Sequence, residues 1–274
     1  MKMPKVIVLL PVYYKDSPAY LQLAVDSMLA QTYLPLDILI GIDGHVDGEL
    51  AQTIQSYSHN ERITLLPFAE NRGLAALLND MIRWAQEHEY QYFARMDADD
   101  ISLPERIEKQ MNFLLNHPEI DAVGGATEEI DELGNKRNKI HIFPLAPDEC
   151  YTYFAKRNPV AHPAVILRQT YFDKTGCLYR PEFRQNQDTM LWFDGLRNGA
   201  RIANISDTVL LFRVTDDFFK KRRNGWEYAK GLLRERKIIN RELHYGWKAT
   251  VYAYLLFVFR ISPPWLIRMA YKIF

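Results

Sequence analysis

The chain has 274 residues, of which 48% are hydrophobic and 25% are charged, a composition that fits a folded globular protein and excludes a disordered or fibrous one. Its formal net charge is zero, which argues against a dedicated nucleic-acid-binding protein because such proteins carry a basic surplus. The length allows one large domain or two small ones.

Short apolar runs alternate with amphipathic segments through the first two-fifths of the chain. These runs predict strands at residues 5–10, 36–42, 62–66 and 90–95, and helices at residues 18–31 and 74–88. The helix at 74–88 has the clearest pattern, because apolar residues recur there at intervals of three and four: Leu74, Leu77, Leu78, Met81, Ile82 and Ala85. Strands that alternate with helices predict an α/β fold with a mostly parallel central sheet flanked by helices.

The middle of the chain predicts further elements of the same domain. They are a helix at 104–116, a strand–turn–strand at 121–143, a helix at 185–198 and an extended segment at 201–214. No repeat and no low-complexity linker interrupts this part of the sequence. We therefore expect one domain over residues 1–215, followed by a basic, amphipathic, helical extension over residues 216–274.

Cysteine usage and the lengths of the apolar runs bear on location. Cys150 and Cys177 do not make a disulfide framework, so we expect reduced thiols in a cytoplasmic protein. The apolar run at residues 5–10 is too short for a signal peptide. The longest apolar stretch, 249–259, stops at Arg260, short of the roughly 20 residues that a spanning helix needs.

Polar or aromatic residues follow the end of each of the first four predicted strands. In chain order they are Pro11 and Tyr13, then Asp43, then Asn71, Arg72 and Gly73, and finally Asp97, Asp99 and Asp100. Ligands bind open α/β sheets at the carboxyl ends of the strands. The four groups therefore predict a ligand site along one edge of the sheet.

The acidic run Met96-Asp97-Ala98-Asp99-Asp100 is the sharpest of these features. Its three carboxylates repel one another unless a cation lies among them, and oxygen ligands favour Mg²⁺ or Mn²⁺. An EF-hand loop is disfavoured by Ile101 and Ser102, and an acidic cap of the next helix would explain only one Asp. A plain surface turn stays open. No glycine-rich phosphate loop is present, so a bound nucleotide would be held through a metal.

In their order and spacing these motifs resemble those of the family-2 glycosyltransferases, above all the bacterial members that build capsule, O-antigen and lipopolysaccharide sugars. The resemblance covers roughly residues 4–215. It is carried by Pro11-Val12-Tyr13, Ile42-Asp43-Gly44, Asn71-Arg72-Gly73-Leu74, Ala94 to Asp100 with Pro104, His162-Pro163, Gln187-Asp188 with Leu191-Trp192, and Phe212-Arg213. Two positions depart from the family pattern: Ile42 and Gln187 stand where the family often has acidic residues.

The resemblance implies a GT-A fold with a nucleotide-sugar-binding half at about 1–117 and an acceptor half at about 118–215. It implies an inverting enzyme that uses Mn²⁺ or Mg²⁺. The enzyme would move a hexose or N-acetylhexosamine from a nucleotide sugar, most often UDP-linked, to a hydroxyl of a saccharide or lipid-linked saccharide. Bacterial surface polysaccharide would be the product.

The resemblance also assigns roles to individual residues. Tyr13 would stack on the base, Asp43 would accept a hydrogen bond from it, Asp97 would lie near the ribose, Asp99 would ligate the metal and Asp188 would be the catalytic base. The other donor-site residues would be Pro11, Asn71, Arg72, Gly73 and Ala98. The acceptor or the diphosphate would meet His162, Trp192, Arg213 and Lys220.

The residues alone leave plainer roles open for several of these positions. Tyr13 and Trp192 suit packing, His162 suits a structural role, and Asp188 suits a helix surface. Two other functions are also open: a sugar nucleotidylyltransferase, although such enzymes have a glycine-rich loop after the first strand, and a non-catalytic nucleotide- or sugar-binding module.

The C-terminal extension concentrates the basic charge. Residues 220–274 hold 13 Lys or Arg and 3 Asp or Glu, and the apolar stretch 249–259 is followed by aromatic and aliphatic residues mixed with cations at 265–274. This pattern predicts a helix on an anionic membrane surface, here the inner face of the plasma membrane. The alternative is a helix that packs on the catalytic domain or on a second subunit.

Overall fold

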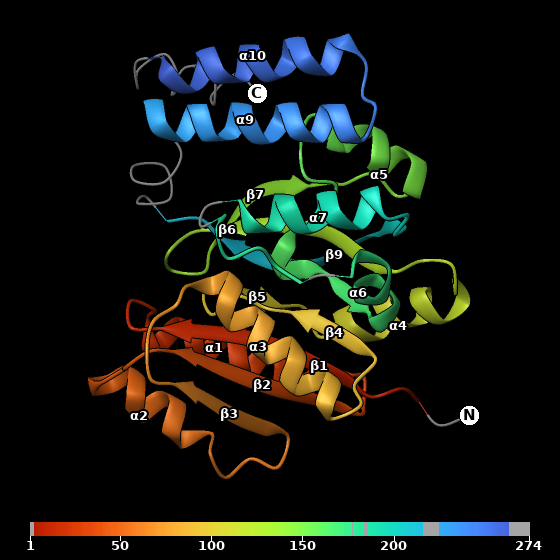
Figure 1. Ribbon diagram of the computed structural model, residues 1–274. Helices are drawn as coiled ribbons and strands as arrows, with labels where there is room; N and C mark the ends of the chain where they lie inside the picture. The colour runs from red at the N-terminus through yellow and green to blue at the C-terminus, as the bar shows by residue number, and fades with distance from the viewer. Residues whose placement is uncertain (1–2, 177, 184–185, 216–224, 263–274) are drawn as a thin grey trace.

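The computed structural model describes residues 3–176, 178–183, 186–215 and 225–262 (Figure 1). Three positions or segments named above, Cys177, Lys220 and 265–274, lie outside these ranges. The strands are β1 (Val6–Tyr13), β2 (Leu36–Asp43), β3 (Ile63–Phe68), β4 (Tyr92–Arg95), β5 (Ile101–Ser102), β6 (Ala122–Ile130), β7 (Lys136–His141), β8 (Ile166–Arg168) and β9 (Ile202–Arg213). The helices are α1 (Pro18–Leu29), α2 (Gly48–Ser56), α3 (Leu74–Glu87), α4 (Arg106–Asn116), α5 (Pro147–Phe154), η1 (His162–Ala164), α6 (Gln169–Thr175), α7 (Gln187–Arg197), α9 (Trp226–Glu242) and α10 (Trp247–Ile261).

Within these ranges the strands form one sheet in the order β3-β2-β1-β4-β8-β6-β9-β5, with β7 paired to β6. The first half of the sheet is parallel, since β1 pairs in parallel with β2 and β4, and β2 with β3. The second half is mixed: β8 runs antiparallel to β4 and β6, while β9 runs parallel to β6. The expectation of a mostly parallel sheet is confirmed, since the longest ladders are parallel. Antiparallel pairing enters beyond β4, in the short ladders of β8 with β4 and β6, of β5 with β9 and of β7 with β6.

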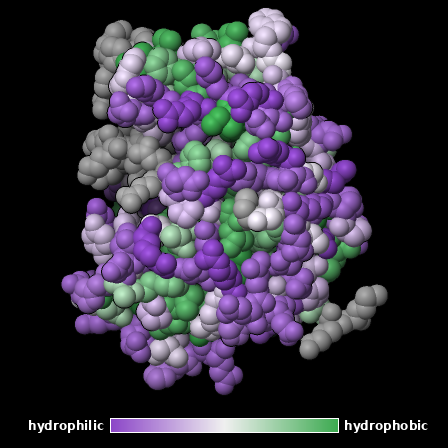
Figure 2. Space-filling model, viewed as in Figure 1, coloured by the Kyte–Doolittle hydropathy of each residue, from purple (hydrophilic) through white to green (hydrophobic). Residues whose placement is uncertain are grey.

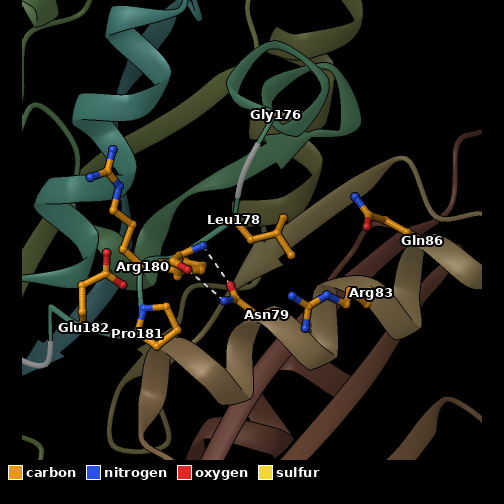
Figure 3. Close-up of a pocket in the computed structure, with 9 residues that line it drawn as sticks. Asn79, Arg83, Gln86, Gly176, Leu178, Arg180, Pro181 and Glu182 are labelled. Atoms are coloured by element: carbon orange, nitrogen blue, oxygen red, sulfur yellow. Dashed lines mark hydrogen bonds between the residues drawn. The ribbon is translucent and has the colours of Figure 1, made fainter.

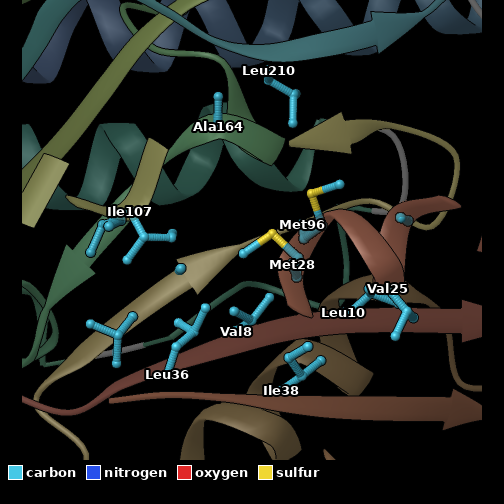
Figure 4. Packing of buried hydrophobic residues seen from close by; sticks show 14 of the residues in the cluster. Val8, Leu10, Val25, Met28, Leu36, Ile38, Met96, Ile107, Ala164 and Leu210 are labelled. Carbon is cyan, nitrogen blue, oxygen red and sulfur yellow. The ribbon is translucent and has the colours of Figure 1, made fainter. Parts of the chain in front are cut away.

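The two faces of the sheet bury separate hydrophobic clusters. Side chains alternate between faces along a strand, so β1 sends Val8 and Leu10 into one cluster and Ile7 and Leu9 into the other. The first cluster packs under α1 and α4, as Figure 4 shows for Val25, Met28 and Ile107, among others. The second packs under α3 and α7. Helices thus cover both faces, as the alternation of strands and helices predicts.

The two C-terminal helices form a pair on the side of the molecule away from β3 (Figure 1). The inner helix, α9, belongs to the body, because Ile239 and Leu243 enter the second cluster and the Arg236 Nη1 donates to the Phe154 carbonyl at 2.7 Å. The outer helix, α10, packs on α9 through Ala249 and Ala253. Helix α9 therefore packs on the rest of the domain, as one of the two alternatives for the C-terminal extension predicts. None of the helices in the described ranges is long and apolar enough to cross a bilayer.

Candidate functional site

The carboxyl ends of β1, β2 and β4 meet at one edge of the sheet. The parallel register sets Tyr13 beside Asp43. The Met96 N–H donates to the Leu9 carbonyl at 3.2 Å, which continues the pairing of β4 with β1 and brings the acidic run to the same edge. The aromatic ring and the two groups of carboxylates therefore converge, as the strand ends predict.

Asp43 holds the turn that precedes α3. Its carboxylate is buried and accepts hydrogen bonds from the backbone N–H groups of Arg72 and Gly73, each at 2.9 Å. The Asn71 side chain donates to the Asp43 carbonyl at 3.1 Å. Gly44 allows this close approach, because it has φ of 85° and an added Cβ would lie 2.7 Å from the Asn71 nitrogen. Asp43 therefore fixes the Asn-Arg-Gly turn against the end of β2.

A cavity of about 170 Å³ opens beside this turn, at the first turn of α3. It is lined by Asn71, Arg72, Gly73, Leu74, Ala75, Pro181, Phe183 and Gln187. The N-terminal turn of a helix carries partial positive charge and attracts anions, and α3 has no acidic residue there. The Arg72 side chain is ion-paired with Asp80 and lies 5.0 Å from the centre of the Phe68 ring, at the border of the cavity.

The acidic run forms a compact cluster. One carboxylate oxygen from each of Asp97, Asp99 and Asp100 lies within 4.8 Å of the others. Asp100 is 1% exposed, and its Oδ2 has no hydrogen-bond partner among the residues described, whereas Asp99 reaches solvent. Enclosure by the protein, with the Asp97 charge, raises the pKa of Asp99 to about 6, and burial raises the pKa of Asp100 well above its usual range. Carboxylate oxygens that repel one another, one of them buried without a partner, fit a hard divalent cation.

Buried arginines support this cluster from below. Arg95 is 1% exposed, donates to the Leu9 carbonyl at 3.1 Å and pairs with Asp97. Arg106 is equally buried and donates to the Arg95 carbonyl at 2.7 Å. Burial lowers the pKa of Arg106 to about 9, so it stays charged at neutral pH. Sequence reasoning missed both roles, because an arginine in or after an apolar strand carries no signal that distinguishes a buried cation from a surface one.

Arg213 is buried against the acidic loop. It is 3% exposed, and its guanidinium donates to the backbone carbonyls of Asp99, Asp131 and Glu132 at 2.8 to 3.1 Å. Its backbone N–H donates to the Asp100 carboxylate at 2.8 Å. Arg213 therefore ties the end of β9 to the acidic loop through its Nε and Nη1. Its Nη2 has no hydrogen-bond partner among the described residues, so a contact of Arg213 with the diphosphate or the acceptor stays a prediction.

Asp188 lies in the first turn of α7 and is held from two sides. The Asn158 side chain donates to its Oδ2 at 2.9 Å, and the Thr189 N–H donates to its Oδ1 at 2.7 Å. The Thr189 hydroxyl in turn donates to the Asn158 Oδ1 at 3.0 Å. The carboxylate is therefore directed by a small network that joins α7 to the loop before η1.

A Tyr–His pair is within electrostatic reach of the acidic cluster, and its tyrosine also of Asp188. The Tyr179 hydroxyl and the His162 Nε2 are 2.7 Å apart. Burial lowers the pKa of His162 to about 3, helped by the Arg95 charge, so the ring is neutral at physiological pH. Burial raises the pKa of Tyr179, and the negative charges of Asp188 and Asp97 raise it further. Sequence reasoning missed Tyr179, which no motif marks.

Trp192 does not lie where an acceptor contact was expected. It is 0% exposed, and its ring meets the edges of the His162 and Tyr171 rings at centroid distances of 6.2 Å. The physical reason is that α7 is buried on every side from Thr189 to Leu196. Trp192, one turn after Asp188, therefore points into the core, where its ring packs against His162.

A larger cavity, of about 500 Å³, lies between α3 and the segment after α6 (Figure 3). It is lined by Asn79, Arg83, Gln86, Gly176, Leu178, Tyr179, Arg180, Pro181 and Glu182. Its arginines are already ion-paired, Arg83 with Asp80 and Arg180 with Asp194. The acidic cluster does not line it, so the candidate site is the strand edge rather than this larger hollow.

Known proteins resemble the chain over most of its length. The sequence profile described as Glycosyl transferase family 2 matches residues 7–176. The amylovoran biosynthesis glycosyltransferase AmsE of Erwinia amylovora is 28% identical and covers 97% of both chains. The UDP-Gal:alpha-D-GlcNAc-diphosphoundecaprenol beta-1,3-galactosyltransferase of Escherichia coli is 28% identical over 97% of this chain and 92% of its own.

Solved structures agree on the fold. The crystal structure of S. aureus TarS 1–349 in complex with UDP-GlcNAc superposes with a TM-score of 0.65 at 13% identity, over 92% of this chain and 70% of the other. The GT-A fold implied by the motifs is therefore confirmed. The profile match also excludes the alternative that the protein is a sugar nucleotidylyltransferase. On its sequence and its fold, the chain belongs to glycosyl transferase family 2.

Proposed function

We propose that the protein is an inverting, metal-assisted glycosyltransferase of bacterial surface polysaccharide synthesis. It moves a hexose or N-acetylhexosamine from a UDP-sugar to a hydroxyl of a lipid-linked saccharide. The observation that carries the proposal is the convergence of Tyr13, Asp43 and the acidic cluster on one edge of the sheet, with Asp188 held on a separate helix by hydrogen bonds from Asn158 and Thr189. Support for the donor and acceptor classes comes from the names of the TarS complex and of the E. coli relative.

On the donor side, the Tyr13 ring stacks on the uracil and Asp43 accepts a hydrogen bond from it. Asp43 retains this capacity, since each of its carboxylate oxygens accepts one backbone hydrogen bond and has a second lone pair. Pro11, Asn71, Arg72, Gly73 and Ala98 line the donor, and Asp97 lies at the ribose. We assign residues 1–117 to this half and 118–215 to the acceptor half.

Asp99 is the ligand that we assign to Mn²⁺ or Mg²⁺, because it is the most exposed of the three carboxylates of the cluster. When bound, such a cation neutralises the charge that develops on the departing diphosphate. Asp97 is held by Arg95, and Asp100 accepts the Arg213 N–H, so both keep the loop in place while Asp99 faces the donor. These contacts hold the loop without a ligand.

Asp188 is the general base. Inversion is an in-line displacement at the anomeric carbon: the acceptor oxygen forms the new bond as the bond to the diphosphate breaks, and the nucleoside diphosphate leaves with the electron pair. The acceptor hydroxyl gives its proton to Asp188, a step that contributes about 10²- to 10⁴-fold to the rate. The neutral His162 and the Tyr179 hydroxyl, which contact each other, can orient sugar hydroxyls by hydrogen bonds.

We also propose that the protein binds the inner face of the plasma membrane from the cytoplasm through α10. Six apolar side chains between 40% and 72% exposed recur along one face of this helix: Trp247, Val251, Tyr254, Leu255, Val258 and Ile261. Figure 2 shows hydrophobic residues in this region, at the top of the view. Exposed cations lie on α9 beside it, at Lys230, Arg234, Lys237 and Arg241. An apolar face bordered by cations suits an anionic bilayer.

Vesicle flotation tests this surface. Vesicles that contain phosphatidylglycerol should carry the protein to the top of the gradient, and Leu255→Glu with Val258→Glu should leave it at the bottom without lowering Tm. Equal flotation of the double variant would assign α10 to a different partner, such as a second copy of the chain.

The transfer reaction is tested by the release of UDP. UDP-galactose, UDP-glucose and UDP-N-acetylglucosamine are each offered with Mn²⁺ and a GlcNAc-diphospho-lipid acceptor, to wild type, Asp99→Ala and Asp188→Asn. We expect turnover with one donor, loss of turnover in both variants, and loss of UDP binding in Asp99→Ala alone. A folded protein that neither binds UDP nor turns over any donor would favour the binding-module interpretation.

A further inference from the structure

The start of α7 contains a capping residue that does not cap. Asn186 occupies the N-cap position, yet its side chain makes no capping hydrogen bond. Instead its Nδ2 donates to the Oε2 of Glu235, on α9, at 2.8 Å. An N-cap Asn normally accepts the N–H of the second or third helical residue, which contributes about 1 kcal/mol to helix stability. This capping hydrogen bond is absent at the start of α7, two residues before Asp188.

The hydrogen-bond donor that Asn186 leaves is used by the base. The third helical residue is Thr189, and its N–H donates to the Asp188 Oδ1 at 2.7 Å. Asn186 and Asp188 are thus two possible acceptors for one backbone donor. Because Glu235 holds the Asn186 side chain, the N–H of Thr189 is left to Asp188.

Glu235 is placed for this role by the packing of α9. The helix buries Leu232, Arg236 and Ile239 against the body, which sets Glu235 at the start of α7. Among the described residues, the charged groups that act on Glu235 are Asp188 on α7, which raises its pKa, and Arg236 on α9, which lowers it. Burial is the largest cause, and together these raise the pKa of Glu235 to about 7.

We propose that Glu235 is a positioning residue for the base: it holds Asn186 away from the N–H of Thr189, so that this donor fixes the carboxylate of Asp188. The inference rests on the proposed role of Asp188 and extends it, because it makes a helix of the C-terminal extension part of the acceptor side. Without Glu235, Asn186 turns back to cap α7 and competes with Asp188 for the donor. Asp188 then loses the hydrogen bond that the Thr189 N–H donates to its Oδ1, and its carboxylate is directed less well.

The test is a double-mutant cycle on transfer, measured as UDP release in the assay described above. Glu235→Ala should lower kcat about tenfold, within the range of general-base contributions, and leave the KM of the donor unchanged. Glu235→Gln keeps an acceptor for Asn186 and should restore most of that loss. In an Asn186→Ala background no competitor for the donor remains, so Glu235→Ala should add little. If the acceptor is not used, the same variants are compared on hydrolysis of the UDP-sugar, in which water gives its proton to Asp188.

Glu242 supplies a matched control. It lies on the same helix and pairs with Arg197 at the other end of α7, at 3.3 Å. Glu242→Ala should leave kcat unchanged, because it removes a carboxylate between the same two helices without reaching Asn186.

Ionisation of Glu235 gives a second readout. A second negative charge near Asp188 raises its affinity for a proton, so kcat/KM of wild type should rise through a step near pH 7 that Glu235→Gln lacks. The stability readout needs no turnover: a carboxyl group with a raised pKa stabilises the fold when protonated and loses that effect as pH rises through about 7. Wild type should therefore lose Tm relative to Glu235→Gln between pH 5 and pH 8.

The outcomes separate this inference from the function on which it rests. An equal loss of kcat from Glu235→Ala in both backgrounds, or no rescue by Gln, would make Glu235 a packing residue and overturn the inference. Full transfer by Asp188→Asn would instead overturn the assignment of the base, whatever Glu235 does.

Discussion

Asp43→Asn should cost stability as well as nucleotide binding, because Asp43 anchors the turn before α3. Both carboxylate oxygens accept backbone hydrogen bonds at 2.9 Å, and the side chain is 4% exposed. An amide keeps one acceptor and turns an NH₂ group toward the other backbone N–H. One hydrogen bond to a charged group is then lost, and such a bond contributes about 1.5–3 kcal/mol. We expect a loss of about 2–3 kcal/mol, or a fall in Tm of about 4–10 °C.

Thermal unfolding with and without UDP measures both effects. UDP at 100 times its Kd adds about 2.7 kcal/mol to wild type, and tenfold weaker binding would leave about 1.4 kcal/mol. Asp47→Asn is the control, because Asp47 lies in the same loop, is exposed and makes no capping hydrogen bond. An unchanged Tm for Asp43→Asn would refute the reasoning, since the carboxylate would then not hold the turn.

Three further results follow from the packing around the site. Arg213→Met should lower the free energy of unfolding by about 3 kcal/mol in chemical denaturation, since it removes the hydrogen bonds that a buried guanidinium donates to three backbone carbonyls; a pure acceptor contact would instead raise only the acceptor KM. Trp192→Ala should cost about 3–5 kcal/mol in the same measurement, while Trp192→Phe should leave the acceptor KM unchanged. His162 is neutral in the fold but binds a proton below about pH 6.5 once the chain is unfolded. The free energy of unfolding therefore decreases as the pH falls. Between pH 7.5 and 5, wild type should lose about 2 kcal/mol that His162→Gln does not lose.

The sequence predicts the first half of the fold well, for a physical reason. Strands buried on both faces read as apolar runs, and helices that cover them have a strong period, as in β1, β2, α3 and α4. The predicted ranges for these elements agree with the structure within a few residues. Elements that depend on tertiary context were not predicted: α2 has only Leu50 and Ile54 buried, and β5 and β8 are two and three residues long.

The site divides in the same way. Residues that follow a strand, such as Asp43 and Asp99, are predictable because the strand end fixes where they lie. Glu235 and Tyr179 were missed, since their positions depend on how a later segment packs over the sheet. Trp192 was placed at the acceptor although it is buried, because proximity in sequence to a motif does not determine which face of an element a side chain occupies.

Three buried arginines fix the acidic loop without neutralising its carboxylates: Arg95, Arg106 and Arg213. Much of their hydrogen bonding goes to backbone carbonyls, those of Leu9, Arg95 and Asp99 among them. The guanidinium groups therefore hold the path of the chain more than they satisfy the carboxylates, and the pKa values of Asp99 and Asp100 stay raised. A loop that is already ordered loses little conformational entropy when a ligand binds. The repulsion among its carboxylates is then available to favour the divalent cation that we propose for this site.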